Sequence, residues 1–138
     1  MITKAIQNSF KKMEQRGWNK TFWAFDIHET IIEPNWDEHN IPTKFYPLAK
    51  ETLQLISKRD DVTMLLYTCS HPQEITKYLE YFKQNNIHFA YVNKNPEVIN
   101  ERYGYYDDKP YFNVLFEDKA GFDPYEDWAK VNELLKEL

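Results

Sequence analysis

Short apolar runs alternate with amphipathic segments along this chain, which predicts an α/β fold with a three-layer, doubly wound and mostly parallel sheet. Helices that join the strands through right-handed crossovers are expected to cover both faces of that sheet. The first run is apolar throughout and then reaches Asp26, as in a strand that is buried on both faces. The expected strands cover residues 21–26, 62–67, 88–92 and 111–117.

Three helices are predicted in the first part of the chain. Apolar residues at helical spacing place one of them over residues 1–17, where Gly17 is suited to end it. A second helix is expected to begin near Pro47, because proline is favoured in a first helical turn. Ser70 and Gln73 form a capping pair, so a third helix is expected to begin after Ser70.

Two more helices are predicted in the second part of the chain. Asn95-Pro96 is expected to open a short helix that Gly104 closes. The last helix is expected over residues 124–138, and Asp123 is placed to cap its first turn. The fourth apolar run lies between these two helices, which completes the alternation.

Composition limits the class of protein. The 138 residues include 17 Lys and Arg, 22 Asp and Glu and one cysteine, with a net charge of −5. We therefore expect no broad nucleic-acid surface, no internal disulfide and a reducing compartment, the cytoplasm. No apolar stretch is long enough to span a bilayer, so no membrane partner is expected. Because no repeat or linker divides the chain, residues 1–138 are interpreted as a single domain, with a motif-bearing core over residues 21–123.

A doubly wound sheet brings the residues at its strand ends together along one edge. Carboxylates from two neighbouring strands suit a hard cation such as Mg²⁺, while a hydroxyl and an ammonium group suit phosphate oxygens. The sequence therefore predicts a site that binds Mg²⁺ and a phosphoryl group. Its candidate residues are Asp26, His28 and Thr30 after the first run, Thr68 and Ser70 after the second, Lys109 before the fourth, and Glu117 and Asp118 at the end of the fourth, with Asp123 soon after.

These motifs, in this order, resemble those of the haloacid dehalogenase superfamily, whose members are mostly Mg²⁺-dependent phosphatases. There, an apolar strand ends Asp-x-Asp-x-Thr, a second strand ends in Thr or Ser, a Lys follows, and a further strand ends in an acidic pair. The Lys-Pro pair before the acidic strand further resembles small, mostly uncharacterised bacterial and phage members without a cap domain. The matching segments are residues 26–31, 65–68, 109–110 and 114–119, and the resemblance covers residues 23–123.

The resemblance implies a catalytic role for several of these residues. Asp26 would be the nucleophile that forms an aspartyl-phosphate, and Thr68 would hydrogen-bond a phosphate oxygen. Lys109 would contact both the phosphate and Asp26, although Lys94 is an alternative for this lysine. Thr30 would have a structural role in the first motif, which fits an ordinary turn cap equally well.

The same resemblance implies how Mg²⁺ would be held. Asp26, the backbone carbonyl of His28, and Asp118 would be its ligands, with Glu117 or Asp123 as a further one. Two simpler interpretations stay open: Asp123 is a helix cap, and Glu117 with Asp118 forms a solvated turn.

His28 departs from the superfamily pattern, in which an Asp at this position protonates the leaving oxygen and then activates water. Histidine can do both, because its ordinary pKa of about 6.5 lies near neutrality. One interpretation is therefore a Mg²⁺-dependent phosphohydrolase that acts through Asp26. The alternative is a non-catalytic module that binds Mg²⁺ and phosphate and has lost turnover at His28. A receiver-like domain is a third, although there the acidic pair ends the first strand.

Access to the predicted site depends on the segments 32–46 and 93–108, which are too short to form a cap domain. We therefore expect an open site that takes a phosphorylated substrate, including a large one such as a protein or a polynucleotide end. A partner subunit that covers the site, and hence an oligomer, is the other interpretation. Trp36 is either part of a small flap over the substrate or a tryptophan packed by its own loop.

Overall fold

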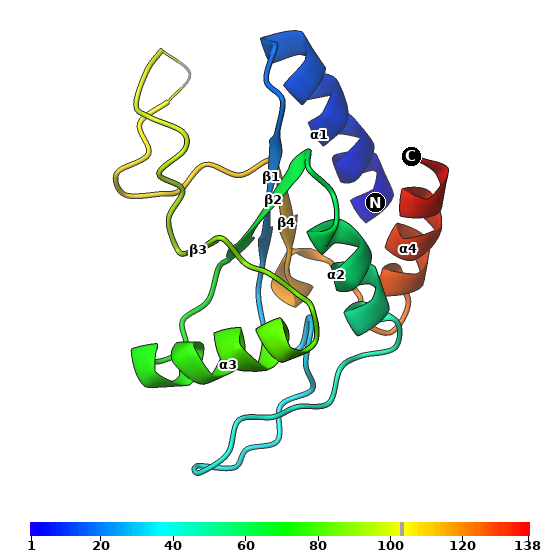
Figure 1. Ribbon diagram of the computed structural model, residues 1–138, viewed down its shortest axis with the longest axis vertical. Coiled ribbons are helices and arrows are strands. Elements are labelled where there is room, and N and C mark those ends of the chain that lie inside the picture. Colours follow the sequence, from blue (N-terminus) through cyan, green and yellow to red (C-terminus); the bar gives the residue numbers. More distant parts are fainter. Residues whose placement is uncertain (103) are drawn as a thin grey trace.

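The computed structural model describes residues 1–102 and 104–138 and has α/β architecture (Figure 1). Its α-helices are α1 (Ile2–Arg16), α2 (Ala49–Ser57), α3 (Pro72–Gln84) and α4 (Asp127–Glu137). Its strands are β1 (Thr21–Phe25), β2 (Val62–Leu66), β3 (Tyr91–Val92) and β4 (Val114–Phe116), and a short 3₁₀ turn, η1 (Asp118–Ala120), follows β4.

The four described strands form one sheet in the order β3-β2-β1-β4, and every neighbouring pair is parallel. Trp23 in the central strand β1 is paired with Met64 of β2 and with Val114 of β4. The α/β class and the parallel sheet are thus confirmed. The strand order follows the Rossmann pattern 3-2-1-4 and not the flavodoxin-like order 2-1-3-4 of receiver domains. The receiver-like alternative is therefore wrong in its topology.

A large hydrophobic core lies on one face of the sheet. All four α-helices contribute buried side chains to it, and α1 and α4 lie side by side in Figure 1. At its centre the rings of Phe25 and Phe116 stack with centroids 4.3 Å apart, and Trp128 of α4 stacks on Phe116 at 5.7 Å. These rings join the ends of β1 and β4 to α4, so the core supports the strand ends that carry the predicted site.

The other face of the sheet has a smaller core that includes Phe22, Ala24 and Leu65. The segments 93–102 and 104–113 cover it with aromatic side chains and stand opposite α1 and α4 in Figure 1. The prediction of helices on both faces is thus wrong for this face.

The helix expected from Asn95 to Gly104 is not formed: residues 95–102 make turns and bends, and residue 103 lies outside the described residues. The Asn95 side chain accepts a hydrogen bond from the Glu97 N–H and donates one to the Tyr111 carbonyl. Asparagine side chains that bind the backbone in this way compete with helix formation.

Several predicted ends are shifted. α1 ends at Arg16, and Gly17 caps it as expected, with a left-handed φ of 68°. α2 begins at Ala49 rather than at Pro47, because Leu48 adopts a left-handed φ of 63° that interrupts the helix. The cap of α3 is His71 with Glu74, not Ser70 with Gln73, since Ser70 is held in a turn by Thr68. β3 and β4 are shorter than the apolar runs that predicted them.

α4 begins at Asp127, three residues later than expected. Residues 124–126 form a turn, and the Asp123 carboxylate accepts a hydrogen bond from the N–H of Tyr125. The Asp127 carboxylate in turn accepts one from the N–H of Asp123. Asp123 therefore stabilises the turn before α4 instead of capping the helix itself.

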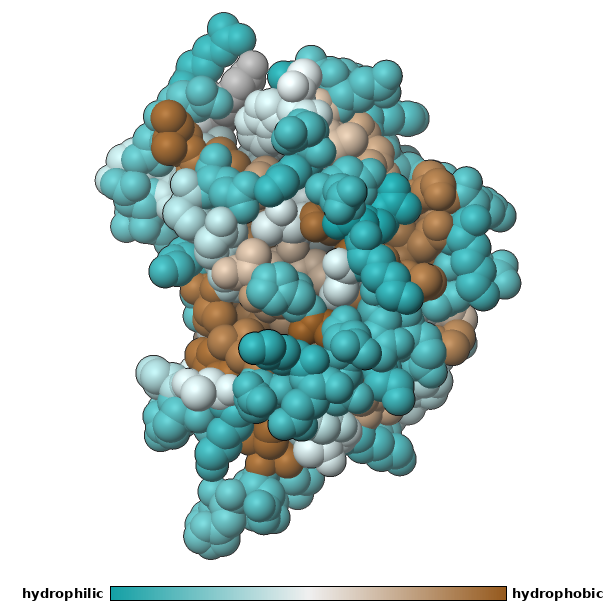
Figure 2. All heavy atoms as spheres, viewed as in Figure 1, coloured by the Kyte–Doolittle hydropathy of each residue, from teal (hydrophilic) through white to brown (hydrophobic). Residues whose placement is uncertain are grey.

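The surface is mostly hydrophilic on the face seen in Figure 2, where hydrophobic side chains lie in separate patches. Among the helices of the described residues, none combines the length and the apolar character needed to cross a lipid bilayer.

The stacked rings predict the effect of a core substitution. Phe116→Ala should lower the free energy of unfolding by about 3–5 kcal/mol, because it leaves a cavity between Phe25 and Trp128. Tyr105→Ala is the matched control: Tyr105 is 65% exposed, and its loss should change the free energy by less than about 0.5 kcal/mol. Urea denaturation of the three proteins measures both effects, and equal midpoints would contradict this account of the core.

Candidate functional site

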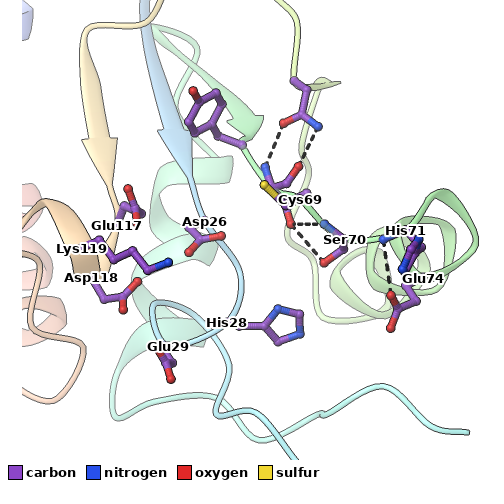
Figure 3. Close-up of a pocket in the computed structure, with 13 residues that line it drawn as sticks. Asp26, His28, Glu29, Cys69, Ser70, His71, Glu74, Glu117, Asp118 and Lys119 are labelled. Carbon is purple, nitrogen blue, oxygen red and sulfur yellow. Dashed lines mark hydrogen bonds between the residues drawn. The ribbon is translucent and has the colours of Figure 1, made fainter. Parts of the chain in front are cut away.

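The turns after β1 and β4 bring three carboxylates together. The N–H of Asp26 donates to the carbonyl of Phe116 at 3.0 Å, so the pairing of these strands continues to the start of the site. Glu117 and Asp118 follow directly on β4. One carboxylate oxygen from each of Asp26, Glu117 and Asp118 lies within 4.8 Å of the other two (Figure 3). This cluster lies where the strand order changes direction between β1 and β4, the place at which open α/β sheets bind ligands.

A tight turn after β1 fixes the relation between the two strand ends. The N–H groups of Thr30, Ile31 and Ile32 all donate to the carbonyl of Ile27, at 3.3, 2.8 and 3.1 Å. Thr30 is fully buried at the centre of the turn, and its hydroxyl accepts a hydrogen bond from the N–H of Asp118 at 3.2 Å.

The carbonyl of Thr30 is also engaged, because it accepts a hydrogen bond from the indole N–H of Trp128 at 2.8 Å. Thr30 thus connects the turn after β1 to the acidic turn after β4 and to α4. This position gives Thr30 a structural role, and the site depends on it for the placement of Asp118.

Burial and the neighbouring carboxylates change the acidity of Asp26. Burial, together with the charges of Glu117 and Asp118, raises its pKa from the ordinary 3.8 to about 6, against the lowering effect of the Ile27 N–H and Lys119. Without a counter-charge, an ionised Asp26 is therefore costly. A cation bound among the three carboxylates would remove that cost.

The cluster forms one side of an open pocket of about 690 Å³ at the carboxyl ends of the strands. Figure 3 shows Glu117, Asp118 and Lys119 on one side of Asp26, and His28, Ser70 and Glu74 on the other. The start of α3 and the turn after β2 complete the wall. The pocket thus places carboxylates, hydroxyls, an imidazole and an ammonium group around one space.

Thr68 and Ser70 supply aliphatic hydroxyls to this pocket. The Thr68 hydroxyl donates to the Ser70 hydroxyl and accepts from the Ser70 N–H, each at 3.1 Å. Asn93, after β3, accepts from the Thr68 N–H and donates to its carbonyl, both at 2.8 Å. Sequence reasoning missed Asn93, whose signal is a polar residue directly after a strand, here with a left-handed φ of 55°.

His28 lies in the pocket wall and contacts α3. Its Nε2 is 2.6 Å from the hydroxyl of Tyr78, a side chain that is otherwise buried in the core. Burial raises the pKa of Tyr78 to about 12 and lowers the pKa of His28, against the opposing charges of Glu74 and Glu29. A phenol that keeps its proton can donate to Nε2 or accept from an Nε2–H, so this contact engages Nε2 and leaves Nδ1 as the other ring nitrogen.

The lysine of the pocket is Lys119, not Lys109. Lys109 is exposed and belongs to the segment that leads into the amino end of β4, away from the carboxyl ends where the pocket lies. Lys94 lines a different cavity. Lys119 follows the acidic pair and extends toward Asp26 in Figure 3, and its charge lowers the pKa of that carboxyl. In the sequence, the signal for Lys119 was its position directly after the acidic pair.

Asp123 is outside the cluster of three carboxylates. It does not line the main pocket, and its side chain is engaged in the turn before α4. The sequence left two interpretations of Asp123, a metal ligand or a helix cap. The hydrogen bond from the Tyr125 N–H supports a role in the turn that leads into α4.

Comparison with known proteins supports the fold alone. No protein-family model and no curated protein matches this chain. A solved structure that does match is that of a conserved protein coded by a locus from Bacteroides thetaiotaomicron, with a TM-score of 0.64 and 22% sequence identity. The match covers 86% of this chain and 92% of that one. At this identity the likeness carries no information about activity.

The raised pKa of Asp26 predicts how its removal affects stability. Asp26 binds its proton more tightly in the folded protein than in the unfolded chain. The stability that this contributes is fully present below about pH 4 and is lost as the pH rises through about 6. In metal-free buffer at pH 7, Asp26→Asn should therefore raise the free energy of unfolding by on the order of 1–2 kcal/mol, after allowance for solvent screening.

Urea denaturation with EDTA, at pH 4 and pH 7, tests this expectation. The difference between parent and Asp26→Asn should be small at pH 4 and appear by pH 7, whereas Asp60→Asn, at an exposed position, should show no such difference. A parent that is more stable than Asp26→Asn at pH 7 without metal would contradict the crowding argument.

Proposed function

We propose that this protein is a capless, Mg²⁺-dependent phosphohydrolase of the haloacid dehalogenase type, acting through Asp26. The observation that carries the proposal is the meeting of Asp26 with Glu117 and Asp118 at the change of strand order. The motif order supports the same function. A reducing cytoplasm with millimolar Mg²⁺ is the compartment that suits it.

The donor set fits Mg²⁺. Three carboxylates whose oxygens lie within 4.8 Å of one another offer the hard oxygen ligands that this ion prefers, and the open pocket leaves space for water and a phosphate oxygen. Asp26 and Asp118 would hold the ion with Glu117, and the backbone carbonyl of His28 is the further predicted ligand. When bound, the ion would neutralise charge on the phosphoryl oxygens.

In the first step, a carboxylate oxygen of Asp26 attacks the phosphorus of a phosphate monoester. A bond forms between that oxygen and phosphorus as the phosphorus–oxygen bond of the ester breaks, and His28, protonated on both ring nitrogens, gives its Nδ1 proton to the departing oxygen and becomes neutral. In the second step, His28 takes a proton from a water molecule, which attacks the aspartyl-phosphate and releases inorganic phosphate and free Asp26. Protons and bonds balance over the cycle.

Neighbouring groups would position the phosphoryl group. The hydroxyls of Thr68 and Ser70 are polar contacts for its oxygens, and Asn93 fixes the backbone that carries Thr68. Lys119 lies where its ammonium group can balance charge on Asp26 and on the phosphate. This assigns to Lys119 the task that the resemblance implied for Lys109.

Tyr78 would act as a positioning residue for His28. Its hydroxyl holds Nε2 at 2.6 Å, which fixes the ring and leaves Nδ1 as the nitrogen that exchanges a proton with the substrate. Because Tyr78 belongs to α3, the proton carrier is set by a different element from the nucleophile.

The second candidate is a non-catalytic module that binds Mg²⁺ and phosphate. Two observations favour it: His28 replaces the usual Asp, and Lys109 lies outside the pocket. In this case the carboxylate cluster would bind its ion as described, but no turnover would follow.

Both candidates predict that Mg²⁺ stabilises the protein. If the ion binds with a Kd of about 1 mM, 10 mM Mg²⁺ should add about 1.4 kcal/mol and raise the Tm by several degrees. Asp118→Asn should abolish the rise, whereas Asp60→Asn should retain it. Differential scanning calorimetry at matched ionic strength measures the shift, and an equal rise in Asp118→Asn would place the ion elsewhere.

Turnover separates the two candidates. The catalytic proposal predicts Mg²⁺-dependent release of inorganic phosphate from phosphate monoesters, complete loss of it in Asp26→Asn, and a loss of about 10²- to 10⁴-fold in His28→Ala, the usual contribution of a positioned proton carrier. The loss should be much smaller for an aryl ester with a good leaving group, which needs no proton. Colorimetric phosphate assays on purified variants measure these rates.

Two results would favour the non-catalytic module. One is a parent protein that binds Mg²⁺ and releases no phosphate from any monoester. The other is activity that appears only when His28→Asp restores the residue of the superfamily pattern.

A further inference from the structure

A second cavity of about 400 Å³ lies beside the pocket described above. The two share His28, Glu29 and Glu74 in their walls, so one ligand can extend from the first into the second. The remaining walls come from Tyr78 and from the loop 34–42, which projects beyond the carboxyl ends of the strands in Figure 1. A cavity of this volume has room for a ring system.

Trp36 in this loop is held out into solvent. Its side chain is 86% exposed, while those of Trp23 and Trp128 are fully buried. The backbone of Trp36 has a left-handed φ of 58°, which is uncommon for a bulky residue. A large aromatic face kept in water beside a cavity is suited to stacking on a flat ligand.

The loop that carries Trp36 is tied by its own side chains. Asn35 accepts a hydrogen bond from the Asp37 N–H at 3.0 Å, and Asp37 accepts one from the His39 N–H at 2.8 Å. The sequence left two interpretations of Trp36, a flap over the substrate or a ring packed by its own loop. The second is wrong, because the loop does not cover the ring.

Charge further restricts the ligand. Glu29, Asp37 and Glu74 line the second cavity, and no Lys or Arg is among the described residues that line it. A second phosphate group would be repelled there, whereas hydroxyl and amino groups could donate hydrogen bonds to the carboxylates of Glu29 and Glu74. The ligand part suited to this cavity therefore carries no negative charge, has an aromatic face and donates hydrogen bonds.

We propose that the second cavity binds the nucleoside part of a nucleoside 5′-monophosphate, with the base stacked on Trp36 and the phosphate in the first pocket. The inference rests on the proposed phosphohydrolase function and adds the substrate class to it. His28, in the wall common to both cavities, is placed beside the oxygen that joins phosphate to ribose, which is the oxygen that must receive a proton. The open site thus serves a small substrate.

A comparison of adenosine 5′-monophosphate with ribose 5-phosphate tests the proposal, because both release a primary alcohol of ribose and only one carries a base. We expect a kcat/KM for the nucleotide that is higher by about 5- to 100-fold, the effect of one base stacked on an aromatic ring. Trp36→Ala should bring the two substrates to similar kcat/KM, and Trp36→Phe should keep most of the difference. Tyr105→Ala, which removes an exposed aromatic ring outside both cavities, should keep all of it.

The outcomes separate this inference from the function on which it rests. Mg²⁺-dependent hydrolysis of both substrates with equal kcat/KM overturns the inference and leaves the phosphohydrolase intact. If neither is hydrolysed, acrylamide quenching of tryptophan fluorescence in the parent protein with Mg²⁺ decides. Adenosine 5′-monophosphate, and not ribose 5-phosphate, must then protect a tryptophan, and the protection must vanish when Trp36→Ala is added. Absence of protection overturns the inference.

Discussion

The junction between the ends of β1 and β4 holds three carboxylates together against their mutual repulsion. The bond from the Asp26 N–H to the Phe116 carbonyl and the bond from the Asp118 N–H to the Thr30 hydroxyl fix this junction from its two sides. Below it, the stacked rings of Phe25, Phe116 and Trp128 bury the strand ends in a core that cannot shift without opening a cavity. Apolar packing therefore holds the three carboxylates in place. It resists the movement apart that their repulsion would otherwise cause.

The crowded carboxylates lower the stability of the folded protein when Asp26 is ionised. Burial and two like charges raise the pKa of Asp26 to about 6, so the fold disfavours the ionised form that a nucleophile needs. A cation reverses this balance, since it lowers the energy of the ionised carboxylates and links ion binding to folding. Nearby Lys119 supplies only one positive charge. A cation at this cluster would therefore favour the ionised form of Asp26, and its binding would be linked to folding.

The residues that the sequence predicted well are those whose position follows from the strands. Asp26, Glu117 and Asp118 end parallel strands, and parallel strands end at one edge, so their meeting needs only the alternation of strand and helix. Residues in the segment 93–113 were predicted poorly. There, asparagine side chains bind the backbone in place of a regular helix, periodicity is absent, and the chain crosses from one end of the sheet to the other. Lys109 therefore lies far along that crossing, and sequence order alone could not place it.

Contacts made across elements were beyond the reach of the sequence. Tyr78 was expected only in the core, because its spacing along α3 is that of a buried stripe, yet its hydroxyl reaches His28 of a turn fifty residues earlier. In the same way, nothing in the order of residues shows that the loop 34–42 encloses a cavity that shares His28 with the main pocket. These contacts divide the tasks of the site among separate elements. Under the proposed function, the sheet edge would fix the nucleophile and its charge, α3 would fix the proton carrier, and the loop with Trp36 would fix the part of the substrate beyond the bond to be broken. Substrate preference could then change in the loop while the chemistry at the sheet edge stayed the same.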